Sequence, residues 1–542
     1  MLTKFGEFFY FTYLYISQNI DMSKKLLPLF FLIVFHFLKA QNEFITIWKP
    51  GIASTPVVNV NAPFQATSNQ IWFPGTGQNY TIRWEEIDFP QHFGVMENVT
   101  STGQILIDFG IPSKEDGANT SYRVKVSNGN GVFQQIKFAT HQPFGSSDVI
   151  LPLLQMNGSA DKLITIEQWG NIEWISMNSA FANCQRVDIT ASDSPDLSHL
   201  TDVSLMFYRA NAFSGGDFMQ NWNTSTIQNF SFMFALQHIP GQIYAPDLNN
   251  FDPPNLNNWN VSAATNLSYM FTGRGVFNQN LSSWNVTNVK NAAWMFTACS
   301  NYNQPLNSWN TSNFENINNM FSATTSFNQP LDNWNTSKVI NMNGTFSSSQ
   351  AFNQPLEMWN VSRVKKMGSM FSNAQSFNQS LGNWDISSLE SANGIFGDSG
   401  INCENYSKTL TGWAENPNTS DNVSLTNLQP MQYAANVASK RDILISKGWT
   451  FFGDGLGSCV LKTNETAFSN HVNIYPNPAS DILYLKNAKD VKSYIITDFS
   501  GRIVLKNNLI KNFINIQSLS PGNYILQILT SKNVENFKFI KK

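Results

Sequence analysis

Apolar and polar positions recur through the middle of this 542-residue chain with a constant step of 25 residues. One unit reads Phe-Asn-Gln-x-Leu-x-x-Trp-Asn-Val-Ser-x-Val, followed by a short segment that ends in Met-Phe. The aromatic residues that keep this step are Trp259, Trp284, Trp309, Trp334, Trp359 and Trp384; Phe277, Tyr302, Phe327, Phe352 and Phe377; and Phe271, Phe296, Phe321, Phe346, Phe371 and Phe396. Because a coil that repeats its path stacks equivalent residues above one another, the pattern predicts a solenoid.

Each unit predicts one coil of that solenoid. Leu281, Trp284 and Val286 are spaced so that positions 284 and 286 share one face of a short strand. The next apolar residues lie three to four positions apart, a spacing that favours one or two helical turns. They are Val289, Ala292, Met295 and Phe296. We therefore expect each coil to pair a short parallel strand with a helical or 3₁₀ return.

An asparagine follows one aromatic residue in every unit, and two roles are open for it. These residues are Asn278, Asn303, Asn328, Asn353 and Asn378. They could contact a ligand. Internal ladders, in which the side chains satisfy backbone groups at successive turns, are the favoured interpretation.

The constant step breaks at both ends of the array. Extra residues within Gln237–Asn258 predict a loop that protrudes from one coil, and either a function or simple solvation explains it. Downstream, Trp413, residues 434–447 and Trp449 predict a helical cap that closes the last coil.

The long motif Met-Phe-x-x-Ala-x-x-Phe-Asn-Gln-x-Leu-x-x-Trp-x-Val-Ser resembles the repeat of BspA-like leucine-rich-repeat surface proteins of bacteria. The segments Leu163–Gly170 and Asn402–Tyr406 resemble the start and the end of that family's array. The resemblance covers residues 158–455. It implies a secreted or cell-surface protein associated with adhesion and binding, and it carries over no catalytic residue.

The residues that flank each tryptophan should point outward and form a polar, nearly uncharged face. The candidate partner-binding residues on it are Asn285, Asn310, Asn335, Asn360 and Asp385. Amide and hydroxyl groups suit hydrogen bonding to a glycan or to a protein partner. A merely solvated face explains the same pattern, and this alternative stays open.

The first 40 residues predict a signal segment. Two lysines precede the apolar run Leu26–Leu38, and the small residue Ala40 precedes Gln41. We expect translation to start at Met22 and cleavage to follow Ala40. Because the apolar run is too short for a typical spanning helix, the mature chain should contain no transmembrane helix.

Residues 41–150 predict a small Ig-like β-sandwich, because short alternating runs are separated by Gly, Pro and Asn turns. The runs are Phe44–Trp48, Tyr80–Trp84, Gln104–Phe109 and Tyr122–Val126. The acidic cluster of Glu85, Glu86 and Asp88 could bind calcium, but the chain lacks a D-x-D-x-D-G loop. A solvated turn is therefore the favoured interpretation of that cluster.

Residues 471–542 follow a predicted linker at 456–470, and their alternation predicts a seven-stranded Ig-like sandwich. Their motif residues are Tyr475, Pro476, Asn477, Pro478, Asp498, Gly501, Arg502, Gly522, Tyr524, Lys541 and Lys542. These motifs resemble the C-terminal type A sorting domain of type IX secretion in Bacteroidetes-type bacteria. The resemblance implies recognition by the type IX secretion machinery, followed by removal or anchoring. An Ig-like stalk without an address function is the alternative.

Composition agrees with an extracellular chain that performs no obvious chemistry. Charged residues make up 13% and the net charge is −3, without a basic patch, so nucleic acid is not an expected partner. No H-E-x-x-H, G-x-S-x-G or P-loop motif is present, so no catalytic residue, metal site or cofactor is predicted. Cys184 and Cys299 are predicted core residues, whereas pairing between Cys403 and Cys459 stays open.

Together these features predict a mainly β protein with short helical returns, in which a leucine-rich-repeat-like solenoid lies between two β-sandwiches. We expect a monomeric, non-enzymatic protein, secreted or held at the outer-membrane cell surface, that binds an extracellular protein or glycan. A structural scaffold of the cell envelope or matrix is the alternative. A secreted polysaccharide-active enzyme is a further one, because carboxylate pairs can lie far apart in sequence.

Overall fold

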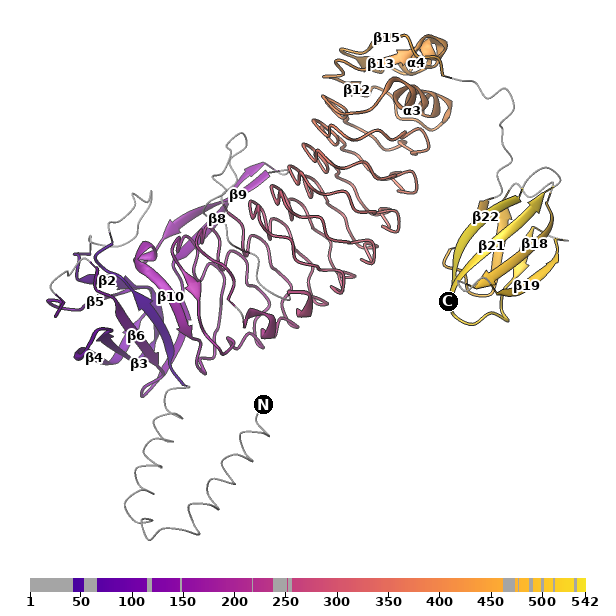
Figure 1. Ribbon diagram of the computed structural model, residues 1–542. Helices are drawn as coiled ribbons and strands as arrows, with labels where there is room; N and C mark the ends of the chain where they lie inside the picture. Colours follow the sequence, from indigo (N-terminus) through magenta and orange to yellow (C-terminus); the bar gives the residue numbers. More distant parts are fainter. Residues whose placement is uncertain are drawn as a thin grey trace. The chain divides into compact units, whose positions relative to one another are not determined.

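The computed structural model describes residues 42–52, 66–114, 119–146, 149–216, 218–236, 251, 256–461, 473–475, 477–486, 491–498, 502–509, 512–530 and 534–542. The chain divides into two compact units, residues 1–461 and 462–542, and each is described by itself (Figure 1). The described residues form many strands and few short helices, which confirms a mainly β protein. None of their helices has the length and apolar character needed to cross a membrane. The signal segment predicted at residues 1–40 lies outside the described residues.

The first unit begins with a mixed sheet. Its strands, in spatial order, are β11 (Asp188–Ile189), β10 (Leu163–Gln168), β1 (Phe44–Trp48), β6 (Tyr122–Ser127), β3 (Gly75–Glu86) and β4 (Phe89–Ser101), and β7 (Val132–Ile136) also pairs with β3. A separate antiparallel pair consists of β2 (Gln70–Phe73) and β5 (Ile105–Asp108). The four runs that the sequence predicted as strands correspond to β1, β3, β5 and β6, although β5 is one residue shorter at each end than the predicted run Gln104–Phe109.

This sheet leads directly into the repeats. Strand β10 pairs antiparallel with β1 and parallel with β11, so the sheet crosses the border predicted between residues 150 and 158. At the junction, Trp169 packs edge-to-face on Trp222 with ring centroids 5.5 Å apart. One hydrophobic core therefore extends from Phe44 to Trp449.

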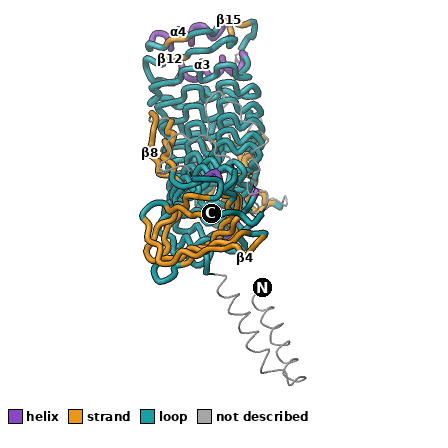
Figure 2. Tube along the Cα trace, turned by 90° about the vertical axis from the view of Figure 1, so that its left-hand side faces the viewer, coloured by secondary structure: helices purple, strands orange, loops and turns teal. Residues whose placement is uncertain are grey.

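A β-hairpin lies alongside the first coils (Figures 1 and 2). It consists of β8 (Ala139–Ser146) and β9 (Val149–Met156), which pair antiparallel along their whole length. Its base is tied to the coils because the Phe138 N–H donates to the Ala180 carbonyl at 3.1 Å.

The repeats form coils that stack in parallel, with one bridging residue per coil. The bridge runs through Asp202, Asn229, Asn266, Asn291, Asn316, Asn341, Lys366 and Ser391. After the bridge, alternate backbone N–H groups donate to the next coil, as Ala292 does to the Asn316 carbonyl at 3.0 Å. The N–H groups between them close turns within the coil, as Met295 does to the Ala292 carbonyl at 3.3 Å.

Both local predictions for the coil are wrong. The predicted helical return is a chain of such turns, and the spacing of three to four residues arises because each turn joins residues i and i+3. The predicted strand at residues 284–286 is also wrong, since this described stretch forms no strand. Turns at 282–283 and 287–288, fixed by the side chains of Asn280 and Asn285, leave too few extended residues for a ladder.

Two columns of mainly phenylalanine rings run through the interior of the coils, beside indoles that also stack in places, as Trp309, Trp334 and Trp359 do. One column runs from Phe181 to Phe396, with successive ring centroids 5.3–6.2 Å apart. The second runs from Phe213 to Phe377, with centroids 5.7–6.3 Å apart. Phe251 occupies one place in the second column, so the chain rejoins the core there. The rest of the insertion predicted at Gln237–Asn258 lies largely outside the described residues.

Each indole of the repeats ties its coil to the preceding one. Trp334 Nε1 donates to the Leu306 carbonyl at 3.0 Å, and that oxygen also accepts from the Trp309 backbone N–H at 3.1 Å. The same indole bond occurs at Trp284, Trp309, Trp359, Trp384 and Trp413. A leucine at this position would have no donor, so the hydrogen bond explains why the repeat uses tryptophan.

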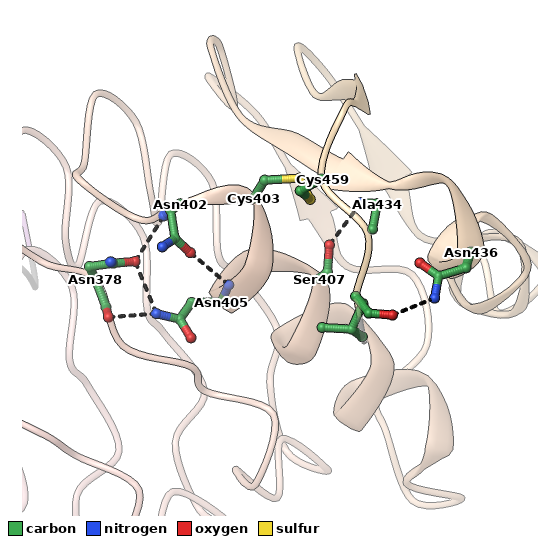
Figure 3. The surroundings of a disulfide bond; sticks show 9 residues. Asn378, Asn402, Cys403, Asn405, Ser407, Ala434, Asn436 and Cys459 are labelled. Carbon is green, nitrogen blue, oxygen red and sulfur yellow. Dashed lines mark hydrogen bonds between the residues drawn. A yellow bond between two sulfur atoms is a disulfide. The ribbon is translucent and has the colours of Figure 1, made fainter. Parts of the chain in front are cut away.

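A helical cap closes the stack, as the sequence predicted. Its elements are α3 (Cys403–Glu415), β12 (Ser424–Leu425), β13 (Gln432–Ala434), the 3₁₀ helix η6 (Ala435–Val437), α4 (Ala438–Ser446), β14 (Thr450–Phe451) and β15 (Gly455–Gly457). Other 3₁₀ helices in the described part of this unit are η2 (Ala160–Lys162), η3 (Met219–Asn221) and η5 (Leu256–Asn258). Cys403 and Cys459 form a disulfide that links α3 to the end of the unit, which resolves the pairing left open by the sequence (Figure 3).

The second unit contains two antiparallel sheets around its own core. One sheet is β16 (Asn473–Tyr475), β17 (Ile482–Lys486) and β20 (Phe513–Asn515); the other is β19 (Ile503–Asn508), β18 (Val491–Asp498), β21 (Gly522–Thr530) and β22 (Val534–Lys541). Tyr494, Ile496, Leu526 and Ile528 are buried in that core. Ile503, at the start of β19, is exposed, and the register of β18 and β19 shifts beside it, between Ile496 and Thr497.

Candidate functional site

The predicted partner-binding residues all lie on exposed turns of the coils. These residues are Asn285, Asn310, Asn335, Asn360 and Asp385. Each side-chain Oδ1 accepts a hydrogen bond from the backbone N–H two residues later, as Asn335 does from Ser337 at 3.1 Å. Because this geometry is that of an Asx turn, the side chains shape the chain after each tryptophan. A partner would meet only the polar atoms that the turn does not use.

The second asparagine set forms an internal ladder, as predicted. Asn353 N donates to Asn328 Oδ1 at 2.9 Å, and Gln354 Nε2 donates to the same oxygen at 3.0 Å. The pattern repeats from coil to coil and ends at Asn378, whose Oδ1 accepts from Asn402 N and Asn405 Nδ2 (Figure 3). Asn402 is also the N-cap of α3, so the ladder continues into the cap.

Of the three residues in the predicted acidic cluster, Glu85 and Glu86 lie in β3 and not in a solvated turn, whereas Asp88 is exposed in the turn at residues 87–88 and pairs with Lys114 at 2.8 Å. Glu86 lies in β3, is buried, and accepts from His92 Nδ1 at 2.6 Å and from the backbone N–H groups of Ser113 and Lys114, which lie after β5. Glu85 pairs with Arg123 and Lys125, both at 2.9 Å. These carboxylates are therefore occupied by protein donors, which gives them a structural role.

A groove that the sequence did not predict lies beside the β8–β9 hairpin, with a cavity volume of about 270 Å³. His141 and Pro152 of the hairpin line one side. Five successive coils line the other side, and the bridging residues among them are Asp202, Asn229, Asn266, Asn291 and Asn316. Figure 2 shows how β8 runs beside these coils. The groove thus depends on two segments that are distant in sequence.

Stacked aromatic rings form the floor of this groove. Phe232 and Tyr269 stack with centroids 4.1 Å apart, and Tyr269 and Trp294 stack at 5.4 Å with nearly parallel planes. The three side chains are 6–9% exposed, so the rings cover one another and present little more than their edges to the groove. The floor is therefore apolar while the bridging column beside it carries amides.

These aromatic residues adopt a backbone conformation that bulky side chains rarely use. Their φ angles are 58°, 61° and 62° for Phe232, Tyr269 and Trp294, and Leu205, which also lines the groove, has 61°. In the last coil that lines the groove and in the coils after it, the same left-handed position is occupied by Asn319, Gly344, Ser369 and Gly394. The left-handed region costs a bulky residue about 1–2 kcal/mol. Strained large side chains at this position thus occur in the first four of the five coils that line the groove.

The groove is close to neutral. Burial lowers the pKa of His141, an effect that nearby Asp202 opposes, so the imidazole is uncharged at neutral pH. Asp202 is the one acidic residue of the described lining, and its Oδ1 accepts from the Ser204 N–H at 2.8 Å. Amides and hydroxyls supply the other polar groups of the lining.

A second hollow, of about 500 Å³, lies between α3 and the neighbouring coils. Glu357, Asn383, Lys408 and Glu415 line it, and its described lining contains no aromatic ring. Leu461, the last described residue of the first unit, also contributes. The hollow is polar and carries charges of both signs.

No group of three or more potential metal ligands comes together within the described ranges. Cys184 and Cys299 are buried free thiols in the core, as predicted. Cys299 Sγ donates to the Phe271 carbonyl at 3.1 Å, and burial raises the pKa of its thiol. These cysteines are therefore protonated packing residues.

The structure brings the first sorting motif and the C-terminal strand together. Asn477 Nδ2 donates to the Lys538 carbonyl at 3.1 Å, and its Oδ1 accepts from the Ile540 N–H at 2.9 Å. Tyr475 stacks on Tyr484 with ring centroids 5.5 Å apart, and the residue after Pro478 bridges Lys541. Lys542 donates its N–H to that same residue, Ala479.

The remaining sorting residues stabilise turns. Asp498 accepts from the backbone N–H and from Nε of Arg502, both at 3.0 Å. Gly522 and Tyr524 belong to the same motif. The Tyr524 hydroxyl donates to the Ser520 carbonyl at 2.8 Å. Pro476 and Gly501, which the sequence also assigned to the motifs, lie outside the described residues.

Comparisons with known proteins agree with this division of the chain. Three stretches, residues 175–244, 241–336 and 308–413, match a family described as "Mycoplasma protein of unknown function, DUF285". Residues 473–542 match the secretion system C-terminal sorting domain. No curated protein matches the chain. The chain thus combines a repeat region with a C-terminal sorting domain, and this combination supports export by type IX secretion to the cell surface.

Proposed function

We propose that the chain is a non-enzymatic binding or adhesion protein of the cell surface, and that its coil stack carries the binding surface. The observation that supports this most is the repetition of equivalent side chains in register from coil to coil, documented by the bridging column and the aromatic columns. A surface built in this way suits an extended partner that contacts several coils at once. The sorting domain would place that surface outside the cell.

The coil stack is best interpreted as a variant of the BspA-like leucine-rich repeat. Leu281, Trp284 and Val286 are buried on one side of the coil, as the Leu-x-x-Leu-x-Leu positions of such repeats would be. The coils differ from such a leucine-rich repeat in where they pair. The backbone pairs with the next coil at Asn291 and the residues after it, whereas the tryptophan segment is joined to the preceding coil by the hydrogen bond from the indole. The β regions before and after the coil stack, residues 41–150 and 471–542, are interpreted as Ig-like sandwiches because apolar and polar residues alternate along their strands.

Removal of residues 473–542 tests the export part of this proposal. We expect the full chain to reach the outside of a bacterium that has type IX secretion, and the truncated chain to remain in the periplasm. Protease accessibility on intact cells distinguishes the two locations. Surface exposure of the truncated chain would refute the role of the sorting domain.

The exposed asparagine face can be tested with matched variants of the mature protein. Asn310→Arg with Asn335→Arg removes both turn acceptors and adds bulk, whereas Asn310→Asp with Asn335→Asp keeps an oxygen for each turn. Binding to immobilised extracellular-matrix proteins and polysaccharides should fall at least tenfold in the arginine variant if this face is used. Unchanged binding by the folded arginine variant would reject the face, and polysaccharide hydrolysis by the wild type would reject a non-enzymatic role.

A further inference from the structure

We propose that the groove beside the β8–β9 hairpin binds a short stretch of an uncharged polysaccharide. This inference deepens the proposed binding function, on which it rests, by assigning a site and a ligand class. It is separate from the asparagine face after each tryptophan, because none of those residues lines the groove.

Strain is the first argument for a binding role. Phe232, Tyr269 and Trp294 occupy left-handed positions where later coils of the same chain use Asn, Gly or Ser. Such strain persists only where the surrounding structure compensates for it, and it clusters at ligand-binding sites. Stacking of the three rings supplies part of that compensation. The chain therefore keeps large rings in these coils although its own repeat offers residues that fit the backbone better.

The dimensions favour a polymer segment over a small molecule or a folded partner. Five stacked coils line the groove, and four coil-to-coil steps of about 4.8 Å make its long side about 19 Å. Its volume of about 270 Å³ lies just below the range of about 300–1,000 Å³ for sites that enclose drug-sized ligands. A narrow and extended ligand fits such a space.

The lining suits a sugar chain in particular. Asn229, Asn266 and Asn291 each use Oδ1 to accept from the backbone N–H two residues later, so the turn leaves the Nδ2 donors unused. Side chains of this kind can donate to hydroxyl groups, while the apolar ring edges of the floor give the C–H surfaces of a sugar van der Waals contact. The described lining contains Asp202 but no Lys or Arg, and His141 is neutral, so the groove disfavours a polyanion.

Two substitutions of the mature protein test the site. Trp294→Asn introduces the residue that the next coil carries at the same left-handed position. Asn291→Asp keeps the oxygen that accepts from Ala293 N but removes the amide donor. Ser369→Asn is the matched control, since it changes the same position in a coil outside the groove.

The probes are cellohexaose, xylohexaose, mannohexaose, maltohexaose and chitohexaose, titrated by calorimetry. We expect the wild type and Ser369→Asn to bind at least one of them with equal affinity. Trp294→Asn and Asn291→Asp should each weaken that binding at least tenfold, measured on protein that circular dichroism shows to be folded. Should Trp294→Asn fail to fold, Asn291→Asp alone decides the outcome.

Three results would overturn the assignment. These are a wild type that binds none of the five hexasaccharides, binding that survives both substitutions, or binding of an unmodified extended peptide that is lost in both variants. A wild type that still binds matrix proteins or polysaccharides through another face would leave the proposed function standing. Absence of every such binding would remove both proposals together.

Discussion

Replacement of Trp334 by Phe isolates the hydrogen bond that links one coil to the preceding coil. Trp334 is buried, and its Nε1 donates to the Leu306 carbonyl at 3.0 Å. Phenylalanine keeps a ring in the core but has no donor, so the carbonyl retains only its bond from the Trp309 N–H. The variant therefore loses one inter-coil hydrogen bond together with some packing.

The control is Trp169→Phe. Trp169 is fully buried too, but its Nε1 has no hydrogen-bond partner among the described residues. Each substitution loses about 1–2 kcal/mol of packing, a fraction of the 3–5 kcal/mol that a full truncation to Ala costs. Trp334→Phe loses a further hydrogen bond worth about 0.5–1.5 kcal/mol, whereas Trp169→Phe removes a buried donor that was unsatisfied. We therefore expect Trp334→Phe to be the more destabilising by at least about 1 kcal/mol.

Urea unfolding of the mature protein, followed by circular dichroism, measures this difference. The same substitution at Trp309 or Trp359 should cost as much as at Trp334, because their indole bonds have the same geometry. Equal destabilisation of Trp334→Phe and Trp169→Phe would refute the view that the indole bond selects tryptophan in the repeat.

Three further predictions concern other parts of the first unit. Replacing Cys403 and Cys459 by Ser removes a disulfide that spans 56 residues, and it should lower the free energy of unfolding by about 4 kcal/mol because the unfolded chain gains entropy. An unchanged urea midpoint of unfolding would contradict this prediction. Asn328→Ala should cost about 1–2 kcal/mol and speed hydrogen exchange at the ladder amide of the next coil, and unchanged exchange would count against the ladder. Burial alone would raise the pKa of Glu86, but hydrogen bonds from His92 and two backbone amides lower it overall. Its carboxylate thus stabilises the fold above the ordinary pKa of about 4.3, and this contribution disappears as pH falls through the lower pKa of the folded state. The melting temperature of Glu86→Gln should therefore depend less on pH between 3 and 7 than that of the wild type. Parallel curves of melting temperature against pH would contradict this.

The stacking of the repeats could be predicted from sequence because it demands the same residue type at every step. The local path of the coil could not. A spacing of three to four residues is produced both by a helix and by successive i→i+3 turns, and only the bonds from Ala292 and Trp294 to the next coil distinguish them. The turn-shaping role of Asn285 and its equivalents could have been predicted from sequence, since an Asn side chain commonly accepts a hydrogen bond from the backbone N–H two residues later and so forms a turn.

The groove lay beyond sequence reasoning for a different physical reason. One of its sides is the hairpin that carries His141, and no local pattern indicates that this hairpin lies against coils up to 175 residues downstream at Asn316. A signal did exist in the repeats. The residue before Met-Phe is large and apolar at Phe232, Tyr269 and Trp294 and is small or polar afterwards. Without the backbone angles, that change gives no hint of strain.

Exchange of the indole N–H protons tests the stacked core most directly. Nitrogen-15 labelling of tryptophan, followed by TROSY spectra in deuterated water, reports each indole of the mature protein separately once single Phe variants assign the signals. Because the indole donors of Trp284, Trp309, Trp334, Trp359 and Trp384 are buried and bound to carbonyls of the preceding coil, these five signals should persist until the whole unit unfolds. Loss of all five within minutes in the folded protein would show that the rings face water and that the coils do not stack.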